Sequence, residues 1–524
     1  MQAQAARVRK QPMKVRAWQP WAIVATLLAL AAFVAWRRYA FLAESPFPLG
    51  IDGYFYPIQL RSIMETGWLD SPASPLAFFL MVPFAWATDP IVGAKLGAAV
   101  WCAAAVFPAY GVAVRLSGFR TTGLVAAALV GLCHGGFYLT IEFVKNGIGI
   151  TVALSLLWLL LRTLEAPSRG RWLSCGAAVV AASFTHKIAA PLALLLAAPA
   201  ILVTLRNRQQ LSRNNVLGGT ATFIVVATFI VVAAVAVRAG WSELRILFSS
   251  RAYWDLPALA LPRKSLMMGH EPLYGAIAAI IIVLGAIGLW LSPWLRQRLH
   301  VVTVQQRVAL VTTLAFAAFA LFLAVPWLDA ANPQGLTFRL RILAFVPLAM
   351  CTAVAVAWLA RFVASMFEAP PVSLAPAIAS VAAAAVLWWS PARIEEGVVV
   401  AHPAMVAAIT GLQDQVPAGV FVIVPERHIA FMTAWYTRAR VRLRPESAPE
   451  TNRMRLVTLA FIGVGSALEH AINVARSEPS VIAPLGTHPL HINGLVLISE
   501  PTWNWILQTL PPNLRARPLA WPTI

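Results

Sequence analysis

Long apolar runs separated by short polar stretches make up most of this chain, from residue 17 to residue 389. A run of about 18 or more apolar residues is long enough to cross the roughly 30 Å hydrocarbon core of a bilayer as a helix. The pattern therefore predicts eleven transmembrane helices. They cover Ala17–Trp36, Ile91–Val114, Thr121–Leu139, Gly147–Leu164, Trp172–Thr185, Ile188–Leu205, Val216–Val237, Tyr274–Leu295, Val308–Trp327, Ile342–Ala360 and Leu374–Trp389.

One further apolar stretch, Pro75–Ala87, is too short to span comfortably, and its placement decides the topology of every later helix. If it lies at the outer interface, the cytoplasmic segments carry 17 cations against two acids, and the opposite side of the membrane part carries 13 cations and 10 acids. This asymmetry follows the positive-inside rule. We therefore expect a cytoplasmic N-terminus. The general style of the sequence suggests the plasma (inner) membrane.

From Arg393 onward the pattern changes to that of a soluble domain on the extracytoplasmic side. Short β-type runs alternate with helical stretches, which predicts a small α/β domain over 393–524 after a membrane domain over 1–392. The expected strands are Val420–Val424, Arg440–Leu443, Arg455–Leu459 and Gly494–Ile498, and the expected helices are His428–Tyr436 and Ala467–Ala475.

Composition supports this division and removes one class of partner. The chain is 59% apolar and 12% charged, about half the charge of a typical soluble protein. Its net charge of +20 suggests nucleic acid at first, but residues 393–524 hold 11 Lys and Arg against 9 Asp and Glu. The positive excess lies in short loops between apolar runs, which indicates membrane orientation and no nucleic-acid partner. All four cysteines fall in apolar segments without metal-ligand spacing, so neither a disulfide framework nor a zinc site is implied.

Two acids on the predicted outer face are candidates for chemistry. Asp52 stands beside Gly53 and is followed by Tyr54 and Tyr56 in the long first outer loop; it is either a solvated turn residue or a general base at the membrane surface. Glu142 could be a second acid facing Asp52, or a metal ligand with it. It could equally be a solvated glutamate that pairs with Lys145, next to Asn146.

Cations on the same face are candidates for binding a phosphate group. His186 and Lys187 form a very short connection after a helix of about 14 apolar residues, so they either line a polar cavity or snorkel to the headgroups. Arg339 and Arg341 precede a predicted helix, where arginines anchor lipids generally or bind one phosphate specifically. His270 and Glu271 are weaker candidates at the end of a loop, residues 238–271, with interleaved aromatic and basic residues.

These motifs resemble the C-type glycosyltransferase superfamily (GT-C), polytopic enzymes that use polyprenyl-phosphate-linked sugars. The resemblance rests on the acid in Gly50-Ile51-Asp52-Gly53-Tyr54-Phe55-Tyr56, on Glu142 with Lys145-Asn146, on Thr185-His186-Lys187 and on the Arg339 region. It implies an all-α membrane domain followed by an extracytoplasmic α/β domain, with short juxtamembrane helices that fit Met64–Thr66 and Pro75–Ala87.

The chain also departs from part of this superfamily. Oligosaccharyltransferases of the superfamily carry a Trp-Trp-Asp motif in the external domain, whereas Trp388-Trp389 is followed by Ser390 at a helix end. The first loop has one clear acid instead of an adjacent pair. Both points weigh against an oligosaccharyltransferase of that kind and against assuming a cofactor, although a divalent metal, Mg or Mn, stays open.

The resemblance implies a glycosyltransferase that moves a sugar from a polyprenyl-phosphate donor to a lipid, glycan or protein acceptor with inversion. Asp52 would be the general base, with Glu142 as a second catalytic acid. The implied donor phosphate ligands are Arg339, Arg341, Lys187 and His186, and the implied substrate loop residues are Tyr54, Tyr56, Lys145, Asn146, His270 and Glu271. Two alternatives stay open: a transporter or lipid flippase, and a non-catalytic cell-envelope assembly protein.

Overall fold

The computed structural model describes the helical part and the sheet of this protein, with gaps between them. The described residues are 19–186, 188–209, 270–292, 303–324, 341–367, 371–389, 401, 403–416, 420–424, 427–442, 453–458, 481–484, 494–499 and 508.

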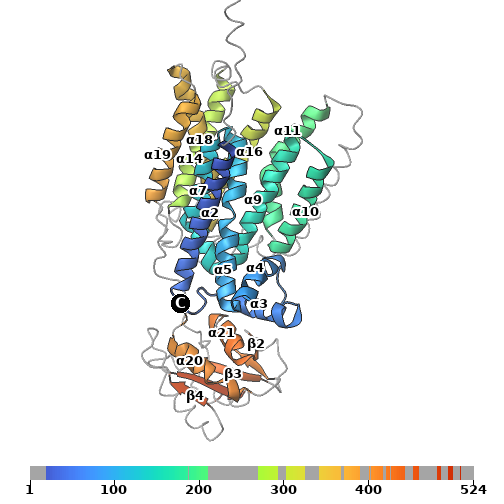
Figure 1. The fold of residues 1–524 in the computed structure, drawn as a ribbon, viewed down its shortest axis with the longest axis vertical. Helices are drawn as coiled ribbons and strands as arrows, with labels where there is room; N and C mark the ends of the chain where they lie inside the picture. Colours follow the sequence, from blue (N-terminus) through green and yellow to red (C-terminus); the bar gives the residue numbers. More distant parts are fainter. Residues whose placement is uncertain are drawn as a thin grey trace, which may run out of the picture.

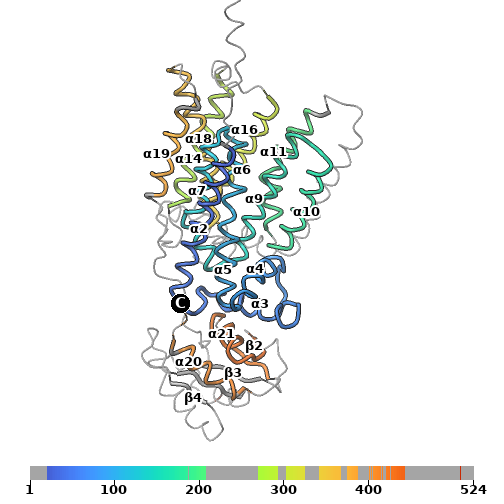
Figure 2. The backbone as a smooth tube through the Cα atoms, in the orientation of Figure 1, coloured from blue at the N-terminus to red at the C-terminus, as the bar shows by residue number. Residues whose placement is uncertain are grey.

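Helices that run side by side form a tall bundle, and a small sheet lies beyond one of its ends (Figure 1). Figure 2 traces the same path as a tube, with the α3–α4 segment between the bundle and the sheet. The bundle helices are α2 (Gln19–Ala43), α5 (Pro90–Ala103), α6 (Val106–Ser117), α7 (Arg120–Leu132), α8 (His134–Glu142), α9 (Val144–Glu165), α10 (Arg169–Thr185), α11 (Ala189–Gln209), α14 (Glu271–Leu291), α16 (Val304–Ala324), α18 (Phe345–Met366) and α19 (Pro371–Trp389).

In the described part of the chain, seven helices are long and apolar enough to cross a membrane, or eight if the bent pair α7–α8 is one span. The shorter α10 and α19 run alongside them (Figure 1). Each predicted span coincides with such helices except Val216–Val237, which lies outside the described residues. The protein is therefore a multi-pass membrane protein, as the apolar runs predicted.

Two predicted spans are not single straight helices. The span from Ile91 is divided into α5 and α6, and the span from Thr121 bends by 42° between α7 and α8. The second break lies at Cys133, whose backbone is extended. Two glycines follow it, and a side chain at Gly135 would overlap the carbonyl oxygen of Ile342. The tight approach of a neighbouring segment thus accompanies the bend, and hydropathy alone gives no sign of it.

Two short helices, α3 (Phe55–Thr66) and α4 (Leu76–Ala87), lie at the end of the bundle that faces the sheet (Figure 1). The expected helix at Pro75–Ala87 is therefore present, and Met64–Thr66 is only the last turn of the longer α3. A side chain at Gly93 of α5 would overlap the backbone of Ala85, so glycine lets α4 pack closely along α5.

The described C-terminal part contains both strands and helices. Its five strands form one mixed sheet in the order β2-β1-β3-β5-β4, in which β2, β1 and β3 are parallel and β5 is antiparallel to both β3 and β4. The elements are α20 (Pro403–Thr410), β1 (Phe421–Ile423), α21 (Arg427–Thr437), β2 (Arg440–Arg442), β3 (Arg453–Thr458), β4 (Val481–Pro484) and β5 (Gly494–Ser499). The sequence did not indicate α20 or β4. The boundary at 392/393 and the helix expected at Ala467–Ala475 lie outside the described residues.

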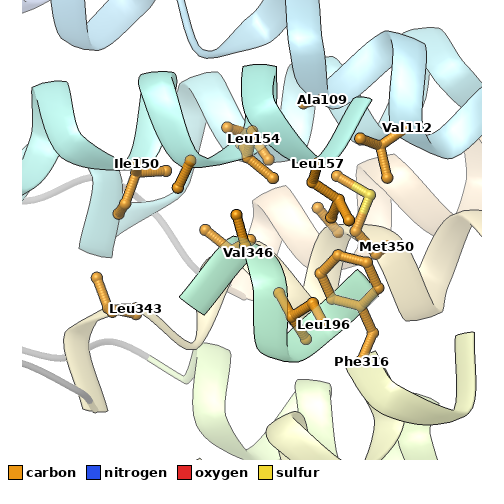
Figure 3. Close-up of a cluster of buried hydrophobic side chains, with 14 of the residues drawn as sticks. Ala109, Val112, Ile150, Leu154, Leu157, Leu196, Phe316, Leu343, Val346 and Met350 are labelled. Carbon is orange, nitrogen blue, oxygen red and sulfur yellow. The ribbon is translucent and has the colours of Figure 1, made fainter. Parts of the chain in front are cut away.

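A large cluster of buried apolar side chains fills the middle of the bundle (Figure 3). Leu157 of α9, Leu196 of α11, Phe316 of α16 and Met350 of α18 meet there. A cavity of about 10 Å³ beside them is lined only by apolar residues and leaves no room for a ligand.

Candidate functional site

Asp52 lies on the turn that joins α2 to α3, at the end of the bundle facing the sheet. The N–H of Gly53 donates to the carbonyl of Gly50 over 3.0 Å, and Gly50 has a φ of +86°. L-residues with a side chain rarely adopt that conformation. A Cβ at Gly50 would also lie 2.9 Å from the carbonyl oxygen of Ile141. Glycine is thus required for the turn that presents Asp52.

Glu142, the last residue of α8, fixes the same turn from the membrane side. Its side chain is only 3% exposed, and its Oε2 accepts a hydrogen bond of 2.9 Å from the backbone N–H of Ile51. Its carboxyl also interacts electrostatically with Asp52. The structure therefore brings the two predicted acids together, and one oxygen of Glu142 is engaged in holding the backbone next to Asp52.

Helix α21 of the C-terminal part contacts the turn from the other side. The Nε of Arg427 lies 2.9 Å from Oδ1 of Asp52, and the two side chains are 33% and 13% exposed. The next residue, His428, is buried, and its Nδ1 lies 3.2 Å from the carbonyl oxygen of Gly50. Because a carbonyl can only accept, Nδ1 is the donor. Burial lowers the pKa of His428 to about 4, so the ring is neutral at pH 7.

Tyr54 is used in this contact and does not face solvent. Its side chain is fully buried, and its hydroxyl lies 3.1 Å from that of Tyr436 in α21. Burial raises the pKa of both phenols, so both stay protonated. Tyr54 therefore packs within the hydrophobic cluster of the C-terminal part.

An aromatic cluster with two cations lies beside the turn. The ring of Phe55 contacts those of Phe78 and Phe431 at centroid distances of 5.6 and 5.2 Å. Lys145 Nζ lies 5.0 Å from the Phe55 centroid, and the guanidinium carbon of Arg427 lies 5.5 Å from that of Phe431. These are cation–π distances. Cationic side chains from α9 and from α21 thus meet one continuous aromatic cluster next to Asp52.

The other residues of the predicted substrate loop lie near this cluster or remain at helix ends. Tyr56 is buried, and its hydroxyl accepts a 3.5 Å contact from the backbone N–H of Lys145. Asn146 is half-buried in the first turn of α9. His270 is exposed and stacks edge-on against Tyr274, 6.2 Å away.

Glu271 is not a loop residue but the first residue of α14, and it is 1% exposed. Its Oε1 accepts a hydrogen bond of 3.3 Å from the N–H of Gly135, at the start of α8. On the other side of the break, Arg38 is 2% exposed and donates to the carbonyl of Gly131 over 3.0 Å. The carboxyl group of Glu271 thus binds a backbone N–H at the start of α8, and the guanidinium of Arg38 binds a backbone carbonyl at the end of α7. Each side chain complements the partial charge of the helix end that it contacts.

The predicted phosphate ligands are only partly within the described residues. Lys187 and Arg339 lie outside them. His186 ends α10, and its Nδ1 accepts a 3.3 Å hydrogen bond from the N–H of Ile188, so it caps the short connection to α11. Arg341 lies just before α18, partly buried beside the α7–α8 break. The structure does not bring His186 to Asp52.

Sequence reasoning missed the residues of α21 altogether. Arg427, His428 and Tyr436 touch the first loop, yet no motif marks them in the sequence. The expected helix His428–Tyr436 was the available signal, but nothing in it indicated which element it would face.

A metal at this site is not supported by the donor groups present. Among the residues that the structure describes, no three His, Cys, Asp or Glu side chains form a group that could hold an ion. Asp52 is paired with a guanidinium, and Glu142 accepts from a backbone amide. The described donor set therefore does not fit Mg or Mn, and no step is derived through a metal.

Comparison with known proteins gives structural neighbours only. No family model matches the sequence, and no curated protein matches it. Over 82% of its length the chain is similar to 65% of the oligosaccharyltransferase AglB from Archaeoglobus fulgidus, solved with an inhibitory peptide and a dolichol-phosphate, with a TM-score of 0.48 and 11% identity. Over 92% of its length it is similar to 98% of ArnT from Cupriavidus metallidurans bound to undecaprenyl phosphate, with a TM-score of 0.44 and 13% identity.

The chain spans just under two thirds of the AglB structure. At such identities and TM-scores, the likeness carries no argument about the activity of this chain, which must rest on the site.

Proposed function

We propose that this protein is an integral membrane glycosyltransferase that moves a sugar from a polyprenyl-phosphate donor to an acceptor on the extracytoplasmic face, with Asp52 as general base. The observation that supports it best is the placement of Asp52. A carboxylate stands on a fixed turn at one end of a dry apolar bundle, with Glu142 behind it and the cations Arg427 and Lys145 beside it. A charged phosphate is costly inside the hydrocarbon, so a donor with a prenyl tail would present its phosphate at an end of the bundle.

The proposed reaction needs little from the protein beyond a base and a cationic surface. The acceptor hydroxyl gives its proton to the carboxylate of Asp52, and its oxygen forms a bond to the anomeric carbon. The bond from that carbon to the phosphate oxygen breaks, and polyprenyl phosphate leaves with the electron pair. Direct displacement inverts the anomeric centre. Cations stabilise the charge on the departing phosphate.

Glu142 is better suited to holding the turn than to acting as a second base, because its Oε2 is bonded to Ile51 N–H. For the phosphate we keep Arg341, with Arg339, Lys187 and His186, as proposed ligands. Tyr56, Lys145 and Asn146 are proposed to line the acceptor side. The orientation, with the sheet outside the cytoplasm in the plasma membrane, follows from the distribution of positive charge.

The test uses purified protein in detergent or lipid with a panel of polyprenyl-phosphate sugars. Binding and slow hydrolysis of each donor are measured for the wild type and for Asp52→Asn, which keeps the size of the side chain and removes its basicity. We expect turnover by the wild type, retained binding by the variant, and loss of turnover by a factor of about 10²–10⁴. Equal turnover by both proteins would show that Asp52 is not the base.

One observation favours a second candidate, a lipid transporter or flippase. The buried ionisable residues Arg38 of α2 and Glu271 of α14 lie beside the break of the α7–α8 span. Broken helices with such residues nearby are typical of transporters. The nine residues of α8 place this break about 13 Å from its outer end. A well-folded wild type that binds no sugar donor but moves a polyprenyl phosphate across vesicles would favour this candidate.

A further inference from the structure

A row of polar contacts joins the first outer loop to α21, and it runs along both segments. His428 bonds Gly50, and Tyr436 bonds Tyr54. Farther along, Arg61 of α3 donates to the carbonyls of Ala434 and Trp435 at the end of α21, over 3.4 and 2.9 Å.

The guanidinium of Arg61 also lies over the Trp435 ring, 4.4 Å from its centroid. At the outer rim, Arg438 pairs with Glu65 over 3.6 Å between exposed side chains. The C-terminal part is therefore docked onto the loop that carries the candidate base by contacts on both sides of it.

Arg427 differs from the other arginines of this row in what it contacts. Arg61 binds helix-end carbonyls and Arg438 binds a surface glutamate, whereas Arg427 binds Asp52 itself. Its guanidinium also lies against Phe431, whose ring packs on Phe55 at the start of α3. The arginine is thus held by the C-terminal part on one side and aimed at the candidate base on the other.

We propose that Arg427 is the positioning residue of Asp52, so that the C-terminal part completes the catalytic centre. This inference rests on the proposed transferase function. The ion pair between Arg427 Nε and Asp52 Oδ1 holds the carboxylate on the side of the turn that faces α21. It also favours the ionised carboxylate, the form a base needs. Arg427 acts through Asp52 and has no contact of its own with the reacting hydroxyl.

The test compares Arg427→Gln and Arg427→Lys with Arg61→Gln, a matched control that loosens the same interface away from Asp52. Donor turnover is measured over pH 4–9 at saturating acceptor and varied donor. For Arg427→Gln we expect kcat to fall about 10- to 100-fold with KM for the donor unchanged, because a misplaced base slows the chemical step.

The pH profile of kcat distinguishes two roles of Arg427: positioning Asp52, or only docking the C-terminal part. Without the cation the carboxylate of Asp52 binds its proton more readily, so the acidic limb of the kcat profile moves up by about one pH unit. Glu142 also interacts electrostatically with Asp52, and His428 binds the same turn at Gly50; both are unchanged in these variants. Arg427→Lys keeps the positive charge, so the acidic limb of its kcat profile should lie at the wild-type pH. Arg61→Gln should also leave the acidic limb at the wild-type pH.

Three outcomes overturn the inference. An unmoved acidic limb in Arg427→Gln, or an equal shift in Arg61→Gln, assigns Arg427 to docking alone. A raised KM for the donor at unchanged kcat makes Arg427 a donor ligand instead. If the wild type turns over no donor, the transferase proposal fails first, which distinguishes that failure from the loss of this inference alone. Limited proteolysis of each variant identifies any that has not folded.

Discussion

Two interfaces of this protein differ in the chemistry of the side chains that form them. Inside the bundle, α9, α11, α16 and α18 share a large cluster of buried apolar side chains (Figure 3). Between the first loop and α21, the contacts include an ion pair, a buried imidazole and a pair of phenols. The contacts of the second interface include groups that can bind or move a proton.

The difference follows from what surrounds each interface. Helices in lipid gain nothing from hydrophobic transfer when they associate, so close packing must hold them together. The loop and α21 lie at the end of the bundle, where polar groups retain access to water before docking. Polar contacts there specify one register of the turn that carries Asp52. The comparison therefore predicts that damage to one interface will leave the other largely intact.

The largest effect is expected for Gly50→Ala, a substitution at the interface between the first loop and α21. The new Cβ would lie 2.9 Å from Glu142 Oε2 at a φ of +86°, so the turn must shift and displace Asp52. We expect donor turnover to fall more than about 100-fold, with the thermal stability of the bundle retained.

The matched control for that variant is Gly67→Ala. Gly67 has a φ of +79° but no atom within 4 Å of an added Cβ, so it meets the same backbone strain without a clash. Full turnover in Gly67→Ala isolates the clash at Gly50. Normal turnover in Gly50→Ala would mean that the position of this turn does not matter for the activity.

A smaller effect, on stability, is expected for Phe316→Ala inside the bundle. Phe316 is fully buried, so replacing it with alanine leaves a cavity. Because the helices remain in lipid when the protein unfolds, the substitution loses packing contacts but little free energy of transfer from water. We expect a loss of between about 2 and 3 kcal/mol in unfolding free energy. Denaturation in mixed micelles measures it, with Phe322→Ala, 44% exposed on the same helix, as the control. A comparable loss in both would contradict the packing argument.

The smallest effect is expected for acidification, which should weaken only the interface between the first loop and α21. Docked His428 has a pKa lowered to about 4, whereas an undocked histidine has its ordinary value of about 6.5. The undocked state therefore binds a proton first, and docking is weakened as the pH falls from about 6.5 towards 4. Between pH 7 and pH 5 the loss is about 2 kcal/mol.

Hydrogen exchange of residues 427–437 at pH 7 and pH 5 measures this change. His428→Gln keeps a donor for Gly50 and does not titrate, so its exchange should be independent of pH in this range. If the wild type is equally independent of pH, the neutral buried imidazole is not what couples docking to pH.

Hydropathy was enough to predict the membrane helices and the short apolar helix α4. These elements can be predicted because the hydropathy of a segment indicates whether lipid or water surrounds it. The break at Cys133 escaped this reasoning, because α7 and α8 are both apolar and the bend is defined by Arg38, Glu271 and a neighbouring backbone. Asp52 and Glu142 were found because they are acids in otherwise apolar surroundings.

By itself, the sequence determined that this chain is a multi-pass membrane protein with its candidate acids at one end. Only the tertiary structure decided what faces them. Arg427 lies 375 positions after Asp52, in a helix whose own pattern is that of an ordinary amphipathic segment. Its pairing depends on how a β1–α21–β2 unit docks onto the bundle, and such non-local contacts leave no periodic trace in either segment.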